Sequence, residues 1–278
     1  MANTALVWIR DDFRIQNNDA LTYASNQHDT VTALFIFNSN IFDQKREAQK
    51  WWVSKSLESF KSDLKKLNIG LEIIKDDEIN FFSKIKSNSK ISVYWNKVYE
   101  PTELEKDKKI GTDFSKKNID FKFFKGNVLN EYNKITKNDG TPFKVYSPFW
   151  RNAEQFYLER LPDKISKVKK CKKINTLFKN QIKSEDILPK SDWYKKFEKY
   201  WMPSEQKAHE HLDNFVNKSI LNYGVDRDFP SIKGTSLLSP YIRNGQINVG
   251  DIWEKCKKLK SNNVSVKKYT NEIGWREF

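Results

Sequence analysis

Residues 91–124 read ISVYWNKVYEPTELEKDKKIGTDFSKKNIDFKFF and contain one complete strand–helix–strand unit. The apolar run at 91–95 predicts a buried strand, the segment 102–117 predicts a helix, and 119–124 predicts the next strand. A strand that is followed by a helix and a second strand closes into a parallel pair through a right-handed crossover. This unit therefore predicts a parallel sheet.

The same alternation runs through the residues that precede this unit. Short apolar runs predict three more strands, and helix-spaced apolar residues or capped segments predict three more helices. The strands are expected at 5–9, 31–37 and 71–75, and the helices at 19–27, 53–67 and 78–87. Because strands and helices alternate five times, we expect an α/β fold with a doubly wound parallel sheet.

Helical patterns dominate the last third of the chain, which we expect to be all-α. Ser204 is placed to cap the first of these helices, and shorter ones are expected at 236–243, 248–259 and 266–278. The segment 162–204 is rich in lysine and has no sustained periodicity, which predicts a solvated connection. The predicted domains are an α/β domain over 1–130, a connecting helix and linker over 131–203, and part of a helical domain over 204–278.

The composition predicts an anionic partner. The 278 residues carry a formal net charge of +14, which favours nucleic acid, although a solvated lysine-rich surface explains the same charge. We find no run of about 18 apolar residues and no leader pattern, so we predict no membrane span and no signal peptide, and expect a cytoplasmic protein. Cys171 and Cys256 are far apart, and His209 and His211 point to different sides of one helix, so no metal site is predicted.

One segment has the features of an anion site. The sequence contains neither G-x-G-x-x-G nor G-x-x-x-x-G-K-[ST], which argues against the usual glycine-rich dinucleotide and P-loop sites. Residues 223–245 read YGVDRDFPSIKGTSLLSPYIRNG, and Gly234, Thr235 and Ser236 precede an expected helix start. Backbone N–H and hydroxyl groups can converge on a phosphate there. An ordinary capped helix is the alternative reading of the same pattern.

Five stretches together resemble the motifs of the DNA photolyase/cryptochrome family, and within it the class I cyclobutane-pyrimidine-dimer photolyases. The stretches are VWIRDDFRIQNNDAL at 7–21, NKVYEPTELEKD at 96–107, TPFKVYSPFWR at 141–151, RDFPSIKGTSLLSPYIRNGQIN at 227–248 and YTNEIGWREF at 269–278. The resemblance implies an α/β antenna domain, an inter-domain loop and the first part of a helical FAD domain. The sequence departs from the family pattern at Asn17, Lys106, Asn248 and Gly274.

The resemblance also implies roles for particular positions. Contacts to the FAD phosphates, ribityl chain and ring fall on Tyr223, Thr235, Ser236, Leu237, Ser239, Tyr269, Glu272 and Arg276. The catalytic pair that meets the damaged pyrimidines corresponds to Glu272 and Trp275, and a contact to the DNA backbone corresponds to Arg227. Glu103 matches a residue that grips a folate antenna in some members, although Thr102 replaces the residue often found beside it.

The implied function is that of a deoxyribodipyrimidine photolyase, in which light drives an electron from reduced FAD into a cyclobutane pyrimidine dimer in DNA. The implied second cofactor is an antenna chromophore, methenyltetrahydrofolate or a deazaflavin. The implied partner is DNA containing pyrimidine dimers, with no membrane association, and we expect a monomer.

Two alternatives stay open: a cryptochrome-type blue-light flavoprotein receptor, and an inactive truncated module that binds DNA or pigment. The family continues well beyond W-R-E-F. We therefore expect that the chain is C-terminally truncated and that it does not catalyse the reaction by itself.

Overall fold

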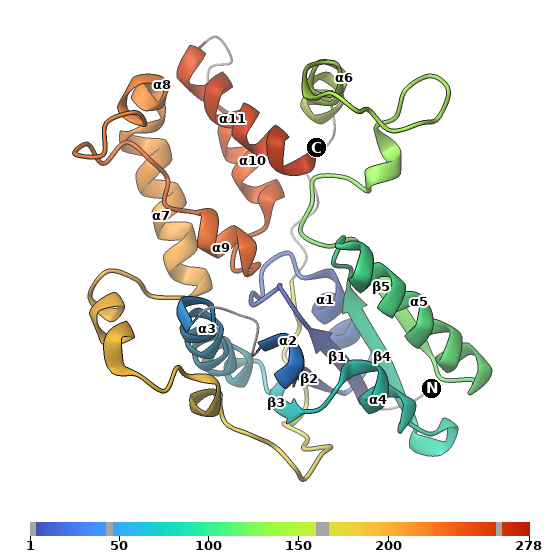
Figure 1. The fold of residues 1–278 in the computed structure, drawn as a ribbon. Coiled ribbons are helices and arrows are strands. Elements are labelled where there is room, and N and C mark those ends of the chain that lie inside the picture. Colours follow the sequence, from blue (N-terminus) through green and yellow to red (C-terminus); the bar gives the residue numbers. More distant parts are fainter. Residues whose placement is uncertain (1–3, 43–46, 160–166, 260–262) are drawn as a thin grey trace. The chain divides into compact units, whose positions relative to one another are not determined.

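The computed structural model describes residues 4–42, 47–159, 167–259 and 263–278, and Figure 1 shows its fold. The chain divides into two compact units. Unit 1 comprises Met1–Gly126, Ile165–Lys207 and Arg243–Gln246, and unit 2 comprises Asn127–Lys164, Ala208–Ile242 and Ile247–Phe278. Unit 1 contains the sheet, whereas the regular structure described in unit 2 is helical.

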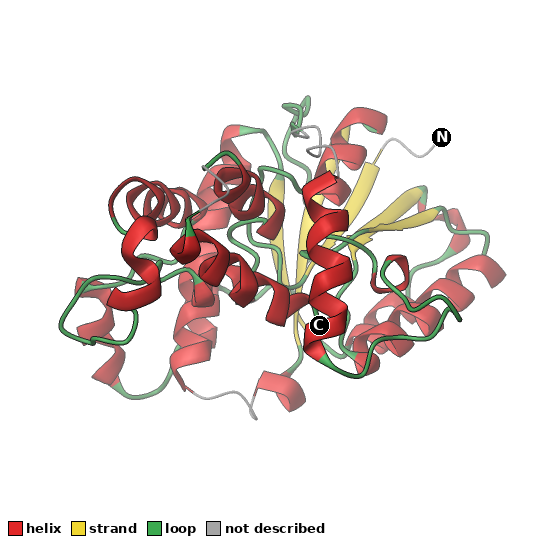
Figure 2. Cartoon of the chain, turned by 90° about the horizontal axis from the view of Figure 1, so that it is seen from above, coloured by secondary structure: helices red, strands yellow, loops and turns green. Residues whose placement is uncertain are grey.

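Unit 1 is built on a five-stranded parallel sheet, whose strands are drawn in yellow in Figure 2. The strands are β1 (Thr4–Ile9), β2 (Thr30–Phe37), β3 (Gly70–Lys75), β4 (Ile91–Asn96) and β5 (Phe121–Phe124). Their order is β3-β2-β1-β4-β5, and every neighbouring pair is parallel. The structure confirms the predicted doubly wound α/β fold, and the strand order reverses at β1 in the middle of the sheet.

The helices account for most of the other regular structure. They are α1 (Asp19–Gln27), α2 (Ser39–Phe42), α3 (Glu47–Lys66), α4 (Glu78–Ser83), α5 (Pro101–Lys116), α6 (Tyr146–Glu159), α7 (Glu205–Lys218), α8 (Tyr223–Asp226), α9 (Ser239–Arg243), α10 (Val249–Lys257) and α11 (Val264–Glu277). None of the helices within the described ranges combines the length and the apolar character that a bilayer crossing requires.

Alternate side chains of β1 enter two different hydrophobic clusters. Ala5, Val7 and Ile9 pack with the apolar faces of α1 and α3. Leu6 and Trp8 pack with those of α4 and α5. Because successive side chains of a strand point to opposite faces of a sheet, the two clusters lie on its two sides. Helices therefore cover both faces of the parallel sheet.

Polar side chains cap several of the helix starts, and α7 is capped as the sequence predicts. The Ser204 hydroxyl accepts a hydrogen bond from the Lys207 backbone N–H at 3.1 Å. At the start of α10, the side-chain oxygen of Asn248 accepts one from the Gly250 N–H at 2.7 Å. Asn248 departs from the family pattern, and this bond explains how asparagine serves there, since it is among the best capping residues.

The segment 167–187 is not the solvated connection expected from its lysine content, and we call it the edge strap. It runs along β3, an edge strand of the sheet, where the Ile182 N–H donates to the Ile73 carbonyl at 2.9 Å. Its side chains that enter the core are Val168, Cys171 and Ile187. An uncovered edge strand exposes unpaired backbone groups, so the strap protects this edge. Its apolar residues are too widely spaced for periodicity to reveal them.

Glu72 of β3 fastens the edge strap by accepting hydrogen bonds from the backbone N–H groups of Leu177 and Phe178, at 2.6 and 2.9 Å. We expect Glu72→Ala to lower the free energy of unfolding by about 2–4 kcal/mol, because two bonds to a charged acceptor are lost. Urea titration measures the change. Glu105→Ala, which removes an exposed carboxylate from α5, is the matched control and should leave the free energy of unfolding close to that of the wild type. Equal effects of the two variants would contradict the role of Glu72.

Candidate functional site

Unit 2 brings together four of the predicted site residues, which we call the ion-pair cluster: Tyr223, Arg227, Tyr269 and Glu272. The two tyrosines are buried, and their rings pack edge to face with centroids 5.1 Å apart. The Arg227 guanidinium lies over the Tyr223 ring at 5.1 Å and forms an ion pair with Glu272. Burial raises the pKa of Tyr269, and a hydrogen bond with Ser236 acts against that shift.

The predicted phosphate loop, 234–239, presents its hydroxyl groups to solvent. They are exposed at Thr235 and Ser239 and half-buried at Ser236. Leu237 has a φ of +55°, a left-handed conformation that is uncommon for a residue other than glycine. Because this conformation cannot continue a right-handed helix, the helix expected from residue 236 begins only at Ser239.

The last turn of α11 carries the other two predicted residues, both of them exposed. Trp275 has an exposed fraction of 54%, and its ring stacks on Tyr146 of α6, a residue to which the sequence motifs gave no role. Arg276 donates a hydrogen bond to the Asn127 carbonyl. Glu272 and Trp275 are three positions apart and so lie on one face of α11. Sequence reasoning could have singled out Tyr146 only through its place in an aromatic motif.

The donor groups of unit 2 suit one side of FAD. Phosphate and sugar oxygens are bound by hydroxyl groups and by forked cations, which are the groups that the phosphate loop and Arg276 supply. The left-handed Leu237 adds a second indication, since backbone strain concentrates at ligand sites. The chemical types of these side chains therefore fit the phosphates and ribityl chain of the cofactor.

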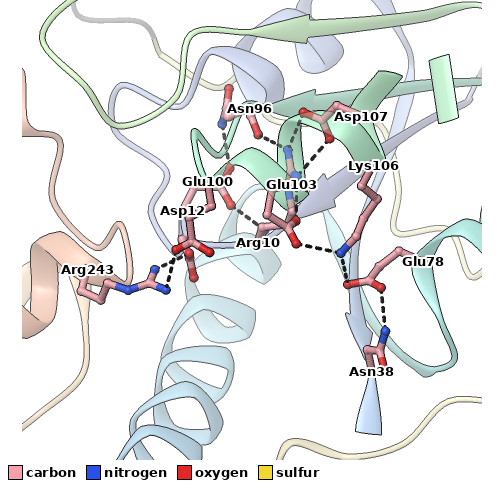
Figure 3. A network of polar contacts seen from close by, with 11 residues as sticks. Arg10, Asp12, Asn38, Glu78, Asn96, Glu100, Glu103, Lys106, Asp107 and Arg243 are labelled. Atoms are coloured by element: carbon pink, nitrogen blue, oxygen red, sulfur yellow. Dashed lines mark hydrogen bonds and ion pairs between the residues drawn. The ribbon is translucent and has the colours of Figure 1, made fainter. Parts of the chain in front are cut away.

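Unit 1 contains a separate cavity of about 130 Å³ at the carboxyl ends of its central strands. Its apolar lining includes Trp8, Phe13, Phe35, Phe42 and Val53, and its polar lining includes Arg10, Asp11, Asn38, Glu78, Glu103 and Arg243. Figure 3 shows the polar contacts around it. Ligands of doubly wound sheets bind at this edge, and Glu103, for which the resemblance implies an antenna contact, is one of the residues that line the cavity.

Two cations already share the Glu103 carboxylate, as Figure 3 shows. Arg10 Nη1 lies 3.2 Å from Glu103 Oε2 and 3.0 Å from Asp107 Oδ1. Lys106 Nζ lies 2.8 Å from Glu103 Oε1 and 3.1 Å from Glu78 Oε1. Burial acts to raise the pKa of Glu103, but the hydrogen bonds and charges of Lys106 and Arg10 outweigh it and lower that pKa. Lys106, where the family has arginine, thus bridges two carboxylates.

This cavity does not fit a second chromophore. Pockets for drug-sized ligands enclose roughly 300–1,000 Å³, which is well above the volume found here. The Glu103 carboxylate, expected to grip a folate, is engaged by Arg10 and Lys106 instead. The antenna role of Glu103 stays a prediction that this arrangement does not support.

Two arginines that the sequence singles out have structural roles in unit 1. The Arg14 guanidinium is buried and donates to the carbonyls of Gly245 and Asn17 at 3.0 and 2.9 Å. Asn17, a departure from the family pattern, has a φ of +51°, which asparagine tolerates better than most residues. Gly245 is required, since a Cβ there would lie 1.8 Å from the Asp11 carbonyl oxygen. Arg14 therefore binds backbone carbonyl groups, whereas Arg10 forms ion pairs with carboxylates.

Comparison with known proteins identifies the family. The family model for DNA photolyase matches residues 5–167, and the chain therefore belongs to the DNA photolyase family. The deoxyribodipyrimidine photo-lyase of Agrobacterium fabrum is 31% identical over 98% of this chain and 57% of its own length. Cryptochrome-2 of Arabidopsis thaliana is 24% identical over 94% of this chain and 44% of its own length.

The solved structures agree with this assignment. A crystal structure of a bacterial class III photolyase from Agrobacterium tumefaciens covers 100% of this chain with 58% of its own, at 30% identity and a TM-score of 0.87. The chain thus spans a little over half the length of the photolyases it matches. The family and the fold predicted from the sequence are confirmed, whereas its place in class I stays a prediction.

Lys106 provides a test of the network in unit 1. We expect Lys106→Met to lower the free energy of unfolding at neutral pH by about 3 kcal/mol, because it leaves the buried Glu78 and the half-buried Glu103 without their shared cation. Lys108→Met is the matched control, since Lys108 also pairs with a glutamate three positions earlier but is 72% exposed, and it should cost less than about 1 kcal/mol.

The pH dependence of the same variant is a further readout. The lowered pKa of Glu103 contributes stability that is present above its ordinary value of 4.5 and is lost as the pH falls through the lowered pKa. Without Lys106 this contribution shrinks, so the difference between variant and wild type should narrow on acidification. A difference that stays constant in urea titrations from neutral pH to a pH below the lowered pKa of Glu103 would contradict the assignment.

Proposed function

We propose that this chain provides the α/β domain and the first helices of the FAD domain of a deoxyribodipyrimidine photolyase, which uses light to split cyclobutane pyrimidine dimers in DNA. The observation that carries the proposal is the exposed face of α11, on which Trp275 lies three positions after Glu272 of the ion-pair cluster. Membership of the DNA photolyase family and the 31% identical photo-lyase support it.

In this proposal FAD binds to unit 2. The hydroxyl groups of the phosphate loop would donate to its phosphates and sugar chain, and Arg276 would add a permanent forked cation. Tyr269, held between Tyr223 and Phe215 by ring contacts, would pack against the flavin. When bound and reduced, the flavin supplies the electron that light drives into the dimer. We assign no antenna chromophore to the cavity of unit 1.

The proposed partner is DNA that contains a pyrimidine dimer. A net charge of +14 would hold phosphates without reading sequence. Trp275 would stack on a dimer that has been flipped out of the duplex, and Glu272 would accept hydrogen bonds from its bases. Arg227, which pairs with Glu272 here, could exchange that partner for a DNA phosphate. We propose that the protein acts as a cytoplasmic monomer, which sedimentation of the purified gene product and its recovery from the soluble fraction would test.

A cryptochrome-type blue-light receptor is the second candidate, because plant cryptochromes also match most of the chain. The exposed pair of Glu272 and Trp275 favours repair, since a receptor has no need of two side chains that face a pyrimidine dimer. An inactive module that binds DNA or pigment is a third reading, and it differs from both in lacking light-driven chemistry.

The deciding experiment is photorepair by the gene product as the cell makes it, with FAD and a reductant. We expect blue light, but not darkness, to remove a cyclobutane thymine dimer from a duplex oligonucleotide. Trp275→Leu should weaken binding of that duplex by about tenfold, the size of one lost base–aromatic stack. Trp193→Leu, which removes another partly exposed indole, is the control and should leave binding unchanged. A flavin-loaded protein that removes no dimers in light would refute the repair proposal.

Flavin retention tests the phosphate side of the site independently of repair. Arg276→Leu should lower the FAD content of the purified gene product by about tenfold, since one charge-assisted phosphate contact is lost. Arg151→Leu is the matched control, because Arg151 is an exposed arginine of α6 with no predicted cofactor role. Visible absorbance per mole of protein measures the effect, and equal flavin content in the two variants would argue against Arg276 as a phosphate ligand.

A further inference from the structure

Three aromatic rings from α6 and α11 form a parallel stack in unit 2. The ring of Trp275 lies on that of Tyr146 with centroids 3.7 Å apart and planes inclined by 9°. The ring of Trp150 is also nearly parallel to that of Tyr146, with the two planes inclined by 9° and the centroids 6.1 Å apart. Figure 1 shows α6 and the carboxyl end of α11 near each other. We call these three residues the aromatic platform.

The inner part of the platform is fixed by its surroundings. Trp150 is buried, and its ring packs edge to face with that of Trp253 of α10. The Tyr146 hydroxyl donates a hydrogen bond to the Asn271 carbonyl at 2.9 Å, which ties this ring to the backbone of α11. Burial raises the pKa of Tyr146 to about 12, so the hydroxyl keeps its proton for that bond at neutral pH.

Gly274 allows the platform to form. A Cβ at this position would lie 2.4 Å from two ring atoms of Trp150 and 2.7 Å from the Tyr146 hydroxyl oxygen. Contacts that short do not occur between real side chains, so any other residue would push α6 away from α11. Gly274 departs from the family pattern, and the platform is the physical reason for glycine there.

The outer part of the platform is open. Trp275 is 54% exposed although Tyr146 covers one of its faces and Phe278 touches it at a steep angle, with centroids 6.0 Å apart. A flat indole with one face packed and one face free is the arrangement on which nucleobases stack in proteins that bind unpaired nucleotides. Glu272, one turn earlier on the same face, adds a hydrogen-bond acceptor beside that surface.

We propose that Tyr146 is a positioning residue, which holds Trp275 flat so that its free face receives an unpaired base of DNA. The proposal rests on the proposed function, because it says how that site holds the base presented to it. The positioning of a base by Tyr146 and Trp275 differs from the proposed repair reaction because it requires neither flavin nor light. Tyr146 acts through Trp275 and itself touches no base.

The test compares two DNA duplexes that differ by a single unpaired thymine, with binding to the full chain in the dark measured by fluorescence anisotropy. We expect wild type to prefer the duplex with the unpaired thymine by about tenfold, since one stack of a base on an aromatic ring is worth that much. Trp275→Leu and Tyr146→Leu should both reduce the preference to less than about twofold. Tyr146→Phe should retain most of it, because the ring remains.

A double variant separates positioning from general stability. If Tyr146 acts through Trp275, then Tyr146→Leu should change nothing further in the Trp275→Leu protein. Tyr200→Leu, which removes a tyrosine that is 76% exposed and lies outside the platform, is the matched control and should keep the wild-type preference. Circular dichroism melting checks that each variant is folded.

Three results would overturn the inference: no preference in wild type, a preference that survives Tyr146→Leu, or a further loss in the double variant. The repair proposal is judged separately by the light-dependent assay. A preference for the unpaired base without dimer splitting would refute only the repair proposal. Dimer splitting without that preference would refute only the positioning role of Tyr146.

Discussion

The burial of β1 on both faces is the constraint from which the rest of unit 1 follows. From Ala5 to Ile9 its side chains are at most 1% exposed, since two helical layers cover them alternately. A strand buried in this way must deliver its polar residues at its carboxyl end, where Arg10, Asp12 and Arg14 begin the next loop. The partners of Arg10 and Asp12 come from the end of β4 and from α5, whereas Arg14 donates to the carbonyls of Asn17 and Gly245. The position of the candidate cavity is therefore a consequence of sheet topology. Its polar lining is a consequence of the ion pairs that the buried charges form.

Buried charge explains why that cavity and the phosphate loop of unit 2 differ as candidate sites. In unit 1 the cations of Arg10, Arg14 and Lys106 are paired with carboxylates or carbonyls of the same unit, because unpaired buried charges would be costly there. In unit 2 the polar groups of the phosphate loop stay at the surface. A site whose charges already satisfy one another offers little to a ligand, whereas exposed hydroxyl groups beside a strained turn can still form new bonds at small cost.

The sequence predicted the strands and most helices because burial on a regular element leaves a periodic pattern. It did not predict the edge strap, since single buried residues such as Cys171 are separated by lysines whose heads reach solvent. It also placed a helix start before Leu237, because a left-handed leucine has no local signal. For the candidate site, the family motifs implied roles for Glu272, Trp275 and their neighbours, but they gave none to Tyr146, although it lies within one of the motifs. A stacking partner on another helix is a tertiary contact, and no spacing along the chain encodes it.

Glycine in the last turns of α11 has a cost that falls on the assembly of the protein. Within a helix, glycine is less favourable than alanine by about 1 kcal/mol, because the unfolded chain loses more freedom there. The end of α11 is thus weak by itself and depends on the docking of α6 against Gly274. The last turn of α11 and the docking of α6 should then form together, so that a change which prevents one also prevents the other.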